Sequence, residues 1–263
     1  MAETLSGGIH ISYDDLGRGE PALLMMTGWC ANRTTMYGQL ATECSKNRRT
    51  LSMDWRGHGL SAVSRGDFGA NELVEDALAV IAASGAQQIV PVATAHAGWI
   101  AIELRRRLAE RISKIVLLEW MVFEAPPPFL EALNTLQAPD QWEHARKQLF
   151  TMWLTGVDNP EVIRLVREMG TQSFEMWARA GCEISAAYHQ QGAPLRMLNS
   201  LEKSVPTLHL YAQDHPGYLM AQEAFAAEHS WFRVRKVEAH SHFPMTEVPG
   251  QVAKEIELFV ASE

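Results

Sequence analysis

The sequence predicts an α/β fold with a mostly parallel central sheet and an inserted helical cap. From residue 20 to residue 120, short apolar runs alternate with helical patterns, as is typical of parallel strands joined by crossover helices. The pattern then becomes wholly helical, beginning at prolines 126–128, which cannot continue a preceding helix. Strand character returns towards the C-terminus. We therefore expect a core of residues 1–123 and 201–263, with residues 124–200 forming the cap.

The boundaries of the individual elements follow from turn and capping residues. Glycine-containing loops end the first two strands, at Thr27-Gly28 and at residues 56–59. Asn71 is a candidate N-cap, because its side chain can accept a hydrogen bond from a first-turn amide, and Gly85 can close the same helix. The expected strands are 21–26, 49–54, 89–93, 112–121, 205–211 and 231–237, and the expected helices are 72–83, 99–109 and about 249–261.

The composition argues against several classes of partner. A formal net charge of -8 over 263 residues disfavours nucleic acid, and the one dense basic run, residues 105–107, fits a solvated helix face. No stretch approaches the ~20 apolar residues that span a bilayer, and no charged leader precedes an apolar run, so we expect a cytoplasmic protein. Cys30, Cys44 and Cys182 are scattered, which predicts neither a disulfide framework nor a metal site. The sequence leaves the oligomeric state open.

A nucleophile elbow without a nucleophile follows the central strand. The run 93–99, Ala-Thr-Ala-His-Ala-Gly-Trp, keeps the layout of the G-x-S-x-G motif of α/β-hydrolases, but Ala95 stands at the reacting position. A methyl group cannot attack a carbonyl carbon. The sequence therefore predicts a hydrolase-like scaffold whose chemistry needs no covalent nucleophile.

A histidine base and two candidate carboxylates lie where strands of this architecture end. His242, just after the last strand and before Phe243-Pro244, is the expected base, and we prefer it to His240. A histidine base needs a carboxylate that fixes its tautomer and stabilises the imidazolium. Glu119 ends an apolar strand, and Asp214 follows the penultimate strand, so both remain candidates.

Backbone amides and indole rings complete the expected site. Gly28, Trp29 and Cys30 lie where one half of an oxyanion hole forms, and the His96 amide would supply the other half. Tryptophans make large apolar walls for flat ligands, although core packing is at least as common a role for any one of them. The expected substrate-binding residues are Trp29, Ala95, His96, Trp99, Trp120, Trp153 and Trp177.

Several motifs taken together resemble one family of enzymes. The sequence is similar, over nearly its whole length, to the cofactor-independent ring-cleaving 2,4-dioxygenases of 3-hydroxy-4-oxoquinolines and 3-hydroxy-4-oxoquinaldines. The Gly-Trp-Cys loop and the tryptophan after the acidic strand end are the more restrictive motifs. The segments that carry the resemblance are Gly28-Trp29-Cys30, Asp54-Trp55-Arg56-Gly57-His58-Gly59-Leu60-Ser61, Pro91-Val92, His96-Ala97-Gly98-Trp99, Glu119-Trp120, Trp153-Leu154 and His242-Phe243-Pro244.

The resemblance implies an α/β-hydrolase fold and an oxidative reaction without metal or flavin. The residue that matches the family base, His242, would remove the 3-hydroxyl proton of a quinolone, and the resulting anion would react directly with O2. The products would be carbon monoxide and an N-acylanthranilate. This chain departs from the family pattern at four positions, because the usual elbow serine, the histidine before it, the histidine after Gly-Trp-Cys and the aspartate partner of the base are replaced by Ala95, Thr94, Ala31 and Glu119.

Two other functions remain open at this stage. The missing serine and histidines are also compatible with a non-catalytic or inactivated quinolone binder. The same base and oxyanion amides could alternatively serve a lyase, isomerase or hydrolase that uses no nucleophile. In every case the expected ligand is a small aromatic heterocycle, with O2 as co-substrate for the dioxygenase alone.

Overall fold

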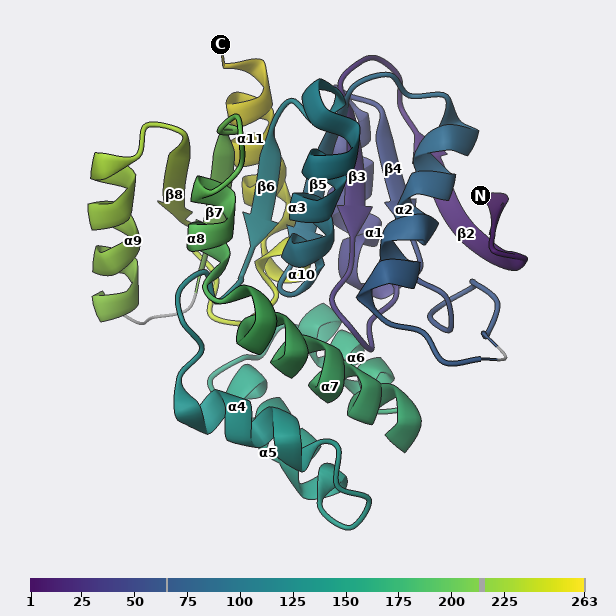
Figure 1. Cartoon of the computed structure of the whole chain (residues 1–263), viewed down its shortest axis with the longest axis vertical. Coiled ribbons are helices and arrows are strands. Elements are labelled where there is room, and N and C mark those ends of the chain that lie inside the picture. The colour runs from purple at the N-terminus through teal and green to yellow at the C-terminus, as the bar shows by residue number, and fades with distance from the viewer. Residues whose placement is uncertain (65, 213–215, 263) are drawn as a thin grey trace.

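A twisted eight-stranded sheet forms the centre of the molecule in the computed structural model, which describes residues 1–64, 66–212 and 216–262 (Figure 1). Within these residues the strand order is β1-β2-β4-β3-β5-β6-β7-β8. The pairs β1–β2 and β2–β4 are antiparallel, and the remaining pairs are parallel. The strands are β1 (Ala2–Ser6), β2 (Ile9–Leu16), β3 (Ala22–Met26), β4 (Thr50–Met53), β5 (Ile89–Thr94), β6 (Ile115–Leu118), β7 (Thr207–Tyr211) and β8 (Phe232–Lys236).

The expected α/β fold with a mostly parallel sheet is confirmed. The strands β3, β4, β5, β6 and β7 are buried along their whole length, because helices cover both faces of the sheet. The chain passes from β3 to β4 on one side and from β4 back across β3 to β5 on the other. This reversal opens a crevice at the carboxyl ends of β3 and β5, which is the usual ligand site of open parallel sheets.

Two helical layers flank the sheet (Figure 1). The helices α2, α3 and α8 lie on the face towards the viewer, and α1, α10 and α11 lie behind the sheet, while α9 packs against the edge strand β8. A short 3₁₀ turn, η1 (Ala109–Arg111), follows α3. The bounds of the helices are α1 (Arg33–Ser45), α2 (Ala70–Ser84), α3 (Ala97–Leu108), α8 (Pro194–Asn199), α9 (Pro216–Glu228), α10 (Pro244–Glu247) and α11 (Pro249–Ala261).

The N-terminus of α2 corrects one sequence expectation. The N-cap is Gly69 rather than Asn71, because the Glu72 carboxylate accepts a hydrogen bond from the Gly69 amide at 2.8 Å. A capping glutamate three residues inside the helix replaces the expected asparagine side chain. At the other end of α2 the expectation is confirmed, since Gly85 adopts a left-handed conformation with φ of +69°.

Four helices of the predicted cap lie across the carboxyl edge of the sheet (Figure 1). These are α4 (Pro127–Thr135), α5 (Trp142–Leu154), α6 (Pro160–Met169) and α7 (Phe174–Gln191). Two cap carboxylates are bound at helix N-termini of the core: Glu168 accepts from Thr35 Oγ1 at 2.7 Å, and Glu183 accepts from the Ala70 amide at 2.7 Å. Negative charge is favoured at helix N-termini, so these contacts hold the cap over the sheet.

One further helix, α8, lies near the end of the predicted cap. The helix α8 packs against α3, on the core side of the predicted cap. None of the helices among the described residues combines the length and the apolar character needed to cross a bilayer.

Candidate active site

The turn between β5 and α3 has the backbone of a nucleophile elbow. Ala95 adopts φ of +49°, a left-handed conformation that is costly for a residue with a side chain. Its amide donates to the Leu118 carbonyl at 2.9 Å, and its carbonyl accepts from the Gly98 amide at 3.0 Å. A Cβ at Gly98 would lie 2.2 Å from the Trp120 ring, so glycine is required for α3 to begin this close to β6. The strained elbow is therefore fully formed around an alanine.

His242 and Glu119 meet beside this elbow. The imidazole Nδ1 lies 3.7 Å from Glu119 Oε2, which is too long for a hydrogen bond but within ion-pair range when the imidazole is protonated. Within the described residues His242 Nδ1 has no hydrogen-bond partner, and catalytic contacts of this kind commonly tighten only with substrate. Glu119 is buried, and its Oε1 accepts a hydrogen bond from the Ala212 amide. The geometry therefore pairs His242 with one of the two carboxylates that the sequence left open.

The sequence offered Asp214 as the alternative to Glu119, and His240 as the alternative to His242. Asp214 lies outside the described residues, so its role as partner stays a prediction. His240 is exposed, and its backbone amide donates to the Glu247 carboxylate at 3.0 Å. Of these two histidines, only His242 lies against the Glu119 carboxylate.

The cap places an aromatic ring flat against His242. The Trp153 indole of α5 stacks on the imidazole with a centroid separation of 5.4 Å and an interplanar angle of 6°. Phe243 packs edge-on against both rings. His242 therefore lies between the sheet, which supplies the carboxylate, and the cap, which supplies an apolar face.

His96 follows the elbow but is not suited to act as a base. Its ring stacks on Phe129 of α4 at 6.1 Å and meets the edge of Tyr188 of α7 at 6.2 Å. Burial, together with the neighbouring His242, lowers the pKa of His96 to about 3. A histidine with this pKa stays neutral at ordinary pH and binds a proton too weakly to remove one from a substrate.

The oxyanion amides require one correction. The Cys30 amide was expected to contribute, but it donates to His58 Nε2 at 3.0 Å, and Cys30 itself adopts φ of +66°. The same His58 ring donates from Nδ1 to the Arg56 carbonyl at 3.0 Å, and burial lowers its pKa, so it is a neutral structural acceptor. The Cys30 amide therefore points into the loop and away from the elbow.

Two amides remain free at the elbow. Within the described part of the chain, neither the Trp29 nor the His96 amide has a hydrogen-bond acceptor. The loop that carries Trp29 lies against the elbow, because a Cβ at Gly28 would lie 3.7 Å from the Thr94 carbonyl oxygen and 4.0 Å from Ala95 Cβ. An oxyanion hole of this fold combines an amide of the elbow with one from a neighbouring loop, so the His96 and Trp29 amides stay its candidates.

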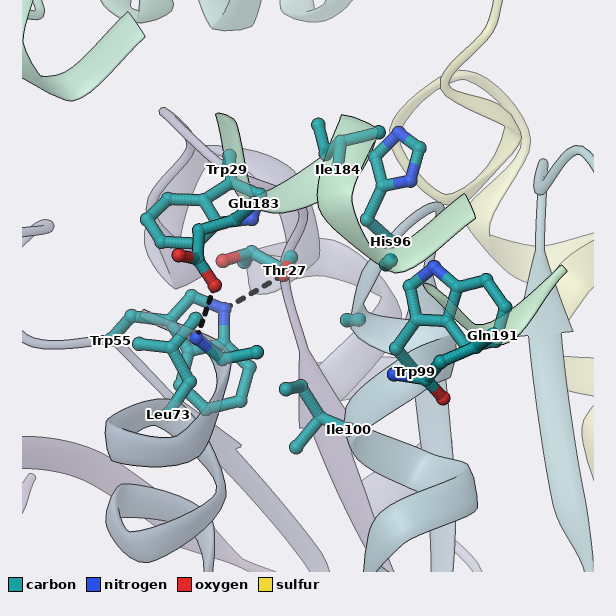
Figure 2. Close-up of a pocket in the computed structure, with 13 residues that line it drawn as sticks. Thr27, Trp29, Trp55, Leu73, His96, Trp99, Ile100, Glu183, Ile184 and Gln191 are labelled. Carbon is teal, nitrogen blue, oxygen red and sulfur yellow. Dashed lines mark hydrogen bonds between the residues drawn. The ribbon is translucent and has the colours of Figure 1, made fainter. Parts of the chain in front are cut away.

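A small cavity lies beside these amides, between the core and α7 (Figure 2). The indoles of Trp29, Trp55 and Trp99 line it, and Figure 2 shows the Glu183 carboxylate of α7 at its edge. The volume of about 40 Å³ is close to that of a single water molecule and far below the ~300 Å³ of a typical ligand pocket. In this conformation the cavity is therefore too small for a bicyclic ligand.

The predicted tryptophans fall into two groups. Trp29, Trp99 and Trp153 lie at the cavity or against His242. Trp120 is fully buried and packs edge-on against Trp99 at 5.0 Å, and Trp177 packs against Phe150 within the cap. Trp120 and Trp177 thus have aromatic packing partners, and their substrate-binding role stays a prediction.

Sequence reasoning missed the residues that surround His96 from the cap. Phe129 and Tyr188 reach the site from helices whose register over the sheet no local pattern specifies. The sequence held one sign of a further polar contact near the site, which is the histidine His209 within the apolar strand β7. Among the described residues no cluster of three or more His, Cys, Asp or Glu side chains could hold a metal ion.

The fold and the site together define an α/β-hydrolase scaffold with a histidine–carboxylate pair, an oxyanion turn and no nucleophile. The family model of the alpha/beta hydrolase family matches residues 23–255. The chain is 35% identical over 252 residues to a 2-heptyl-3-hydroxy-4(1H)-quinolone dioxygenase of Mycobacteroides abscessus, covering 94% of this chain and 93% of that protein. It is 33% identical over 257 residues to the 1H-3-hydroxy-4-oxoquinoline 2,4-dioxygenase of Pseudomonas putida, covering 96% and 97%.

Solved structures agree with these sequence relatives. The structure of AqDC with its product, which concerns recognition and ring cleavage of the Pseudomonas quinolone signal (PQS), superposes with a TM-score of 0.93 at 33% identity and covers all of both chains. A thermophilic esterase from Thermogutta terrifontis, at 21% identity and a TM-score of 0.77, shares the fold alone. The chain belongs to the family of ring-cleaving 3-hydroxy-4-quinolone dioxygenases, which are oxidoreductases built on the α/β-hydrolase fold.

Proposed function

We propose that this protein cleaves the heterocyclic ring of a 3-hydroxy-4(1H)-quinolone with O2, releasing carbon monoxide and an N-acylanthranilate. One observation carries the proposal: a His242–Glu119 pair lies beside a complete elbow that holds Ala95 instead of a nucleophile. This combination suits a reaction that begins with proton removal and forms no acyl-enzyme. The family relatives named above support the same substrate class.

His242 acts as the general base in the first step. Glu119 faces Nδ1, so the opposite nitrogen, Nε2, is the one that takes the 3-hydroxyl proton of the substrate. The Glu119 carboxylate is buried and hydrogen-bonded to the Ala212 amide, and it stabilises the imidazolium that forms. The product of this step is an electron-rich quinolone anion.

The anion then reacts with O2 in a site that excludes water. Oxygen bonds to ring carbon C2, and the terminal oxygen of the resulting peroxide attacks the C4 carbonyl to close a bicyclic endoperoxide. In this proposal the Trp29 and His96 amides stabilise the negative charge that develops on the C4 oxygen, which is supported by the close approach of the Gly28 loop to the elbow. Collapse of the endoperoxide breaks the O–O bond and both carbon bonds of C3, which leaves as carbon monoxide with its own oxygen.

The aromatic residues at the site hold the flat substrate. Trp153 offers a flat apolar face beside His242 on which a quinolone can stack, with its 3-hydroxyl group directed at Nε2 in the plane of the imidazole. The substituent at C2 would lie towards the cap, whose side chains then set the substrate preference. The oxygen and the quinolone are the only partners that this mechanism requires.

Isotope labelling tests the proposal. Under ¹⁸O2, the mechanism predicts that both oxygen labels appear in the N-acylanthranilate and that the carbon monoxide carries none. Mass spectrometry of the product and of the released gas reads out both. Labelled carbon monoxide would contradict the endoperoxide route, and tight quinolone binding without any product would show a binder in place of an enzyme.

A further inference from the structure

We propose that His209 and Gln222 are positioning residues that hold Glu119 in the geometry needed to support the base. The inference rests on the proposed function, because it assigns to these two buried residues the support of the His242–Glu119 pair. Neither side chain touches the elbow or the cavity. Both lie behind the strand end that carries Glu119.

The backbone at Glu119 is strained and therefore needs external support. The strand β6 ends at Leu118, and Glu119 adopts φ of +46°, a conformation that is costly for a residue with a side chain. The Glu119 amide still belongs to the sheet ladder and donates to the Leu210 carbonyl at 3.1 Å. The turn begins immediately after this bond, and it directs the carboxylate towards the Ala212 amide and His242.

His209 receives the first amide that leaves the ladder. The buried Trp120 amide donates to His209 Nε2 at 3.1 Å. His209 lies within β7 and is completely buried, and burial lowers its pKa, so the ring stays neutral. Without this acceptor the Trp120 amide would be a buried donor with no partner, a cost that rotation of the peptide would relieve. Rotation of that peptide would move Glu119.

Gln222 fixes the tautomer of His209. Because Nε2 accepts from Trp120, the proton of the neutral ring lies on Nδ1, which donates to Gln222 Oε1 of α9. Gln222 is also completely buried, and within the described residues its Nε2 has no hydrogen-bond partner. Burying an amide in this way is costly, and the contact with His209 accounts for its presence.

Tyr218 braces the same turn from the same helix. Its hydroxyl accepts from the Val122 amide at 2.5 Å and lies 3.4 Å from the Trp120 carbonyl oxygen, to which it donates. Burial raises the pKa of Tyr218 to about 12, so the hydroxyl keeps its proton. The helix α9 therefore supports the 119–122 turn in two ways, through Gln222 by way of His209 of β7 and directly through the Tyr218 hydroxyl.

Substitution of His209 tests the inference with two readouts. In His209→Leu the ring is replaced by an apolar side chain of similar size and the Trp120 amide loses its acceptor. We expect kcat to fall on the order of 10–10²-fold, as displaced catalytic groups do, while the Kd for the quinolone measured without O2 stays within about twofold. His209→Gln, whose Oε1 can reach the Trp120 amide, should restore most of kcat.

Matched variants separate positioning from general packing. His229→Leu makes the same change at the end of α9, where the ring contacts Phe225 and not the 119–122 turn, and should leave kcat unchanged. If His209→Leu does not fold, Gln222→Met tests the same pair, because it leaves the imidazole in place and removes the acceptor that fixes its tautomer. Unchanged kcat in a folded His209→Leu or Gln222→Met variant would overturn the inference.

Crystal structures of the variants give a readout that needs no turnover. The inference predicts that Glu119 leaves its left-handed conformation and moves away from His242 in His209→Leu, and that both return in His209→Gln. If the wild-type protein cleaves no quinolone, the proposed function fails, and these structures still decide the positioning role. An undisturbed 119–122 turn in His209→Leu would contradict it.

Discussion

Ala95 keeps the backbone of a nucleophile elbow, and its methyl group leaves His242 as the reactive side chain beside the turn. The φ of +49° at Ala95 is the strain that presents a nucleophile in related folds. The loop that carries Trp29 lies against the same turn, with Gly28 close to Thr94 and Ala95. The chemistry that the residues permit is therefore proton removal followed by stabilisation of an anion.

Replacement of the base should abolish turnover and leave the fold intact. For His242→Ala we expect kcat to fall by at least about 10²-fold, the lower range of the contribution of a general base. Far-ultraviolet circular dichroism and oxygen-electrode assays would measure fold and turnover. The matched control is His240→Ala, since His240 is exposed two residues away, and its turnover should match the wild type. Equal losses in both variants would argue against the assignment.

The carboxylate partner can be identified by comparing two isosteric changes. Glu119→Gln keeps an oxygen for the Ala212 amide but removes the charge that faces His242. We expect roughly a 10²–10⁴-fold loss of kcat with an unchanged Kd for the quinolone. Asp214→Asn is the comparison, and the geometry predicts a much smaller effect. A larger loss in Asp214→Asn would give the partner role to Asp214.

At the scale of elements, the cap is held by its carboxylates at two helix N-termini. Glu183 of α7 binds the Ala70 amide at the start of α2, and the Arg179 guanidinium lies 4.1 Å from the Phe68 ring centroid, one helical turn earlier on α7. These contacts set the position of the helix that covers the cavity in Figure 2. Cap position therefore depends on a few polar contacts at the N-termini of α1 and α2.

Removal of the Glu183 carboxylate should loosen the cap. For Glu183→Ala we expect a loss of about 1 kcal/mol in the free energy of unfolding, typical of a lost helix cap, and a higher KM for the quinolone. Denaturant unfolding and steady-state kinetics would measure the two effects. Glu175→Ala is the control, because Glu175 is exposed in the first turn of the same helix. An unchanged KM in Glu183→Ala would show that this contact does not set the cap position.

The sequence predicted the helices and strands whose residues have a clear apolar pattern. The buried strands β3 to β7 appear as apolar runs, because helices cover both of their faces. The strands β1 and β2 were missed, and β1 alternates exposed and half-buried residues at the sheet edge. The helix α1 was missed because its sequence has a weak apolar periodicity. The boundaries of the core and the cap at 123/124 and 200/201 stay predictions.

The candidate site likewise has residues that the sequence could predict and residues that it could not. His242 and Glu119 were predictable, because strand ends of this architecture carry the reacting groups. The Cys30 amide was not, since its direction depends on a left-handed φ and on His58, 28 residues away. The His209–Gln222 pair depends on the packing of α9 against β7, which no local pattern encodes.

For the whole molecule, buried neutral histidines predict loss of stability in acid. Burial lowers the pKa of His58, His96 and His209 in the folded protein. Below about pH 6.5 the unfolded chain binds protons at these rings while the folded protein does not, so protonation favours unfolding. The contribution of these rings to stability is complete above that pH and is progressively lost below it.

Unfolding measurements across pH test this expectation. We expect the free energy of unfolding to fall between pH 6.5 and pH 5, and the fall should be smaller in His58→Gln, which removes one titrating ring. Urea titrations at several pH values would measure both. A flat profile over this range in the wild type would contradict the neutral state of the three rings.

The most direct test of the account is the gas balance of a single reaction. Metal-stripped protein would be mixed with a 3-hydroxy-4(1H)-quinolone in air, and O2 uptake and carbon monoxide release would be followed for the wild type and His242→Ala. The account predicts one O2 consumed and one carbon monoxide released per quinolone in the wild type, and neither in the variant. Quinolone turnover without O2 uptake, or equal turnover in the variant, would contradict it.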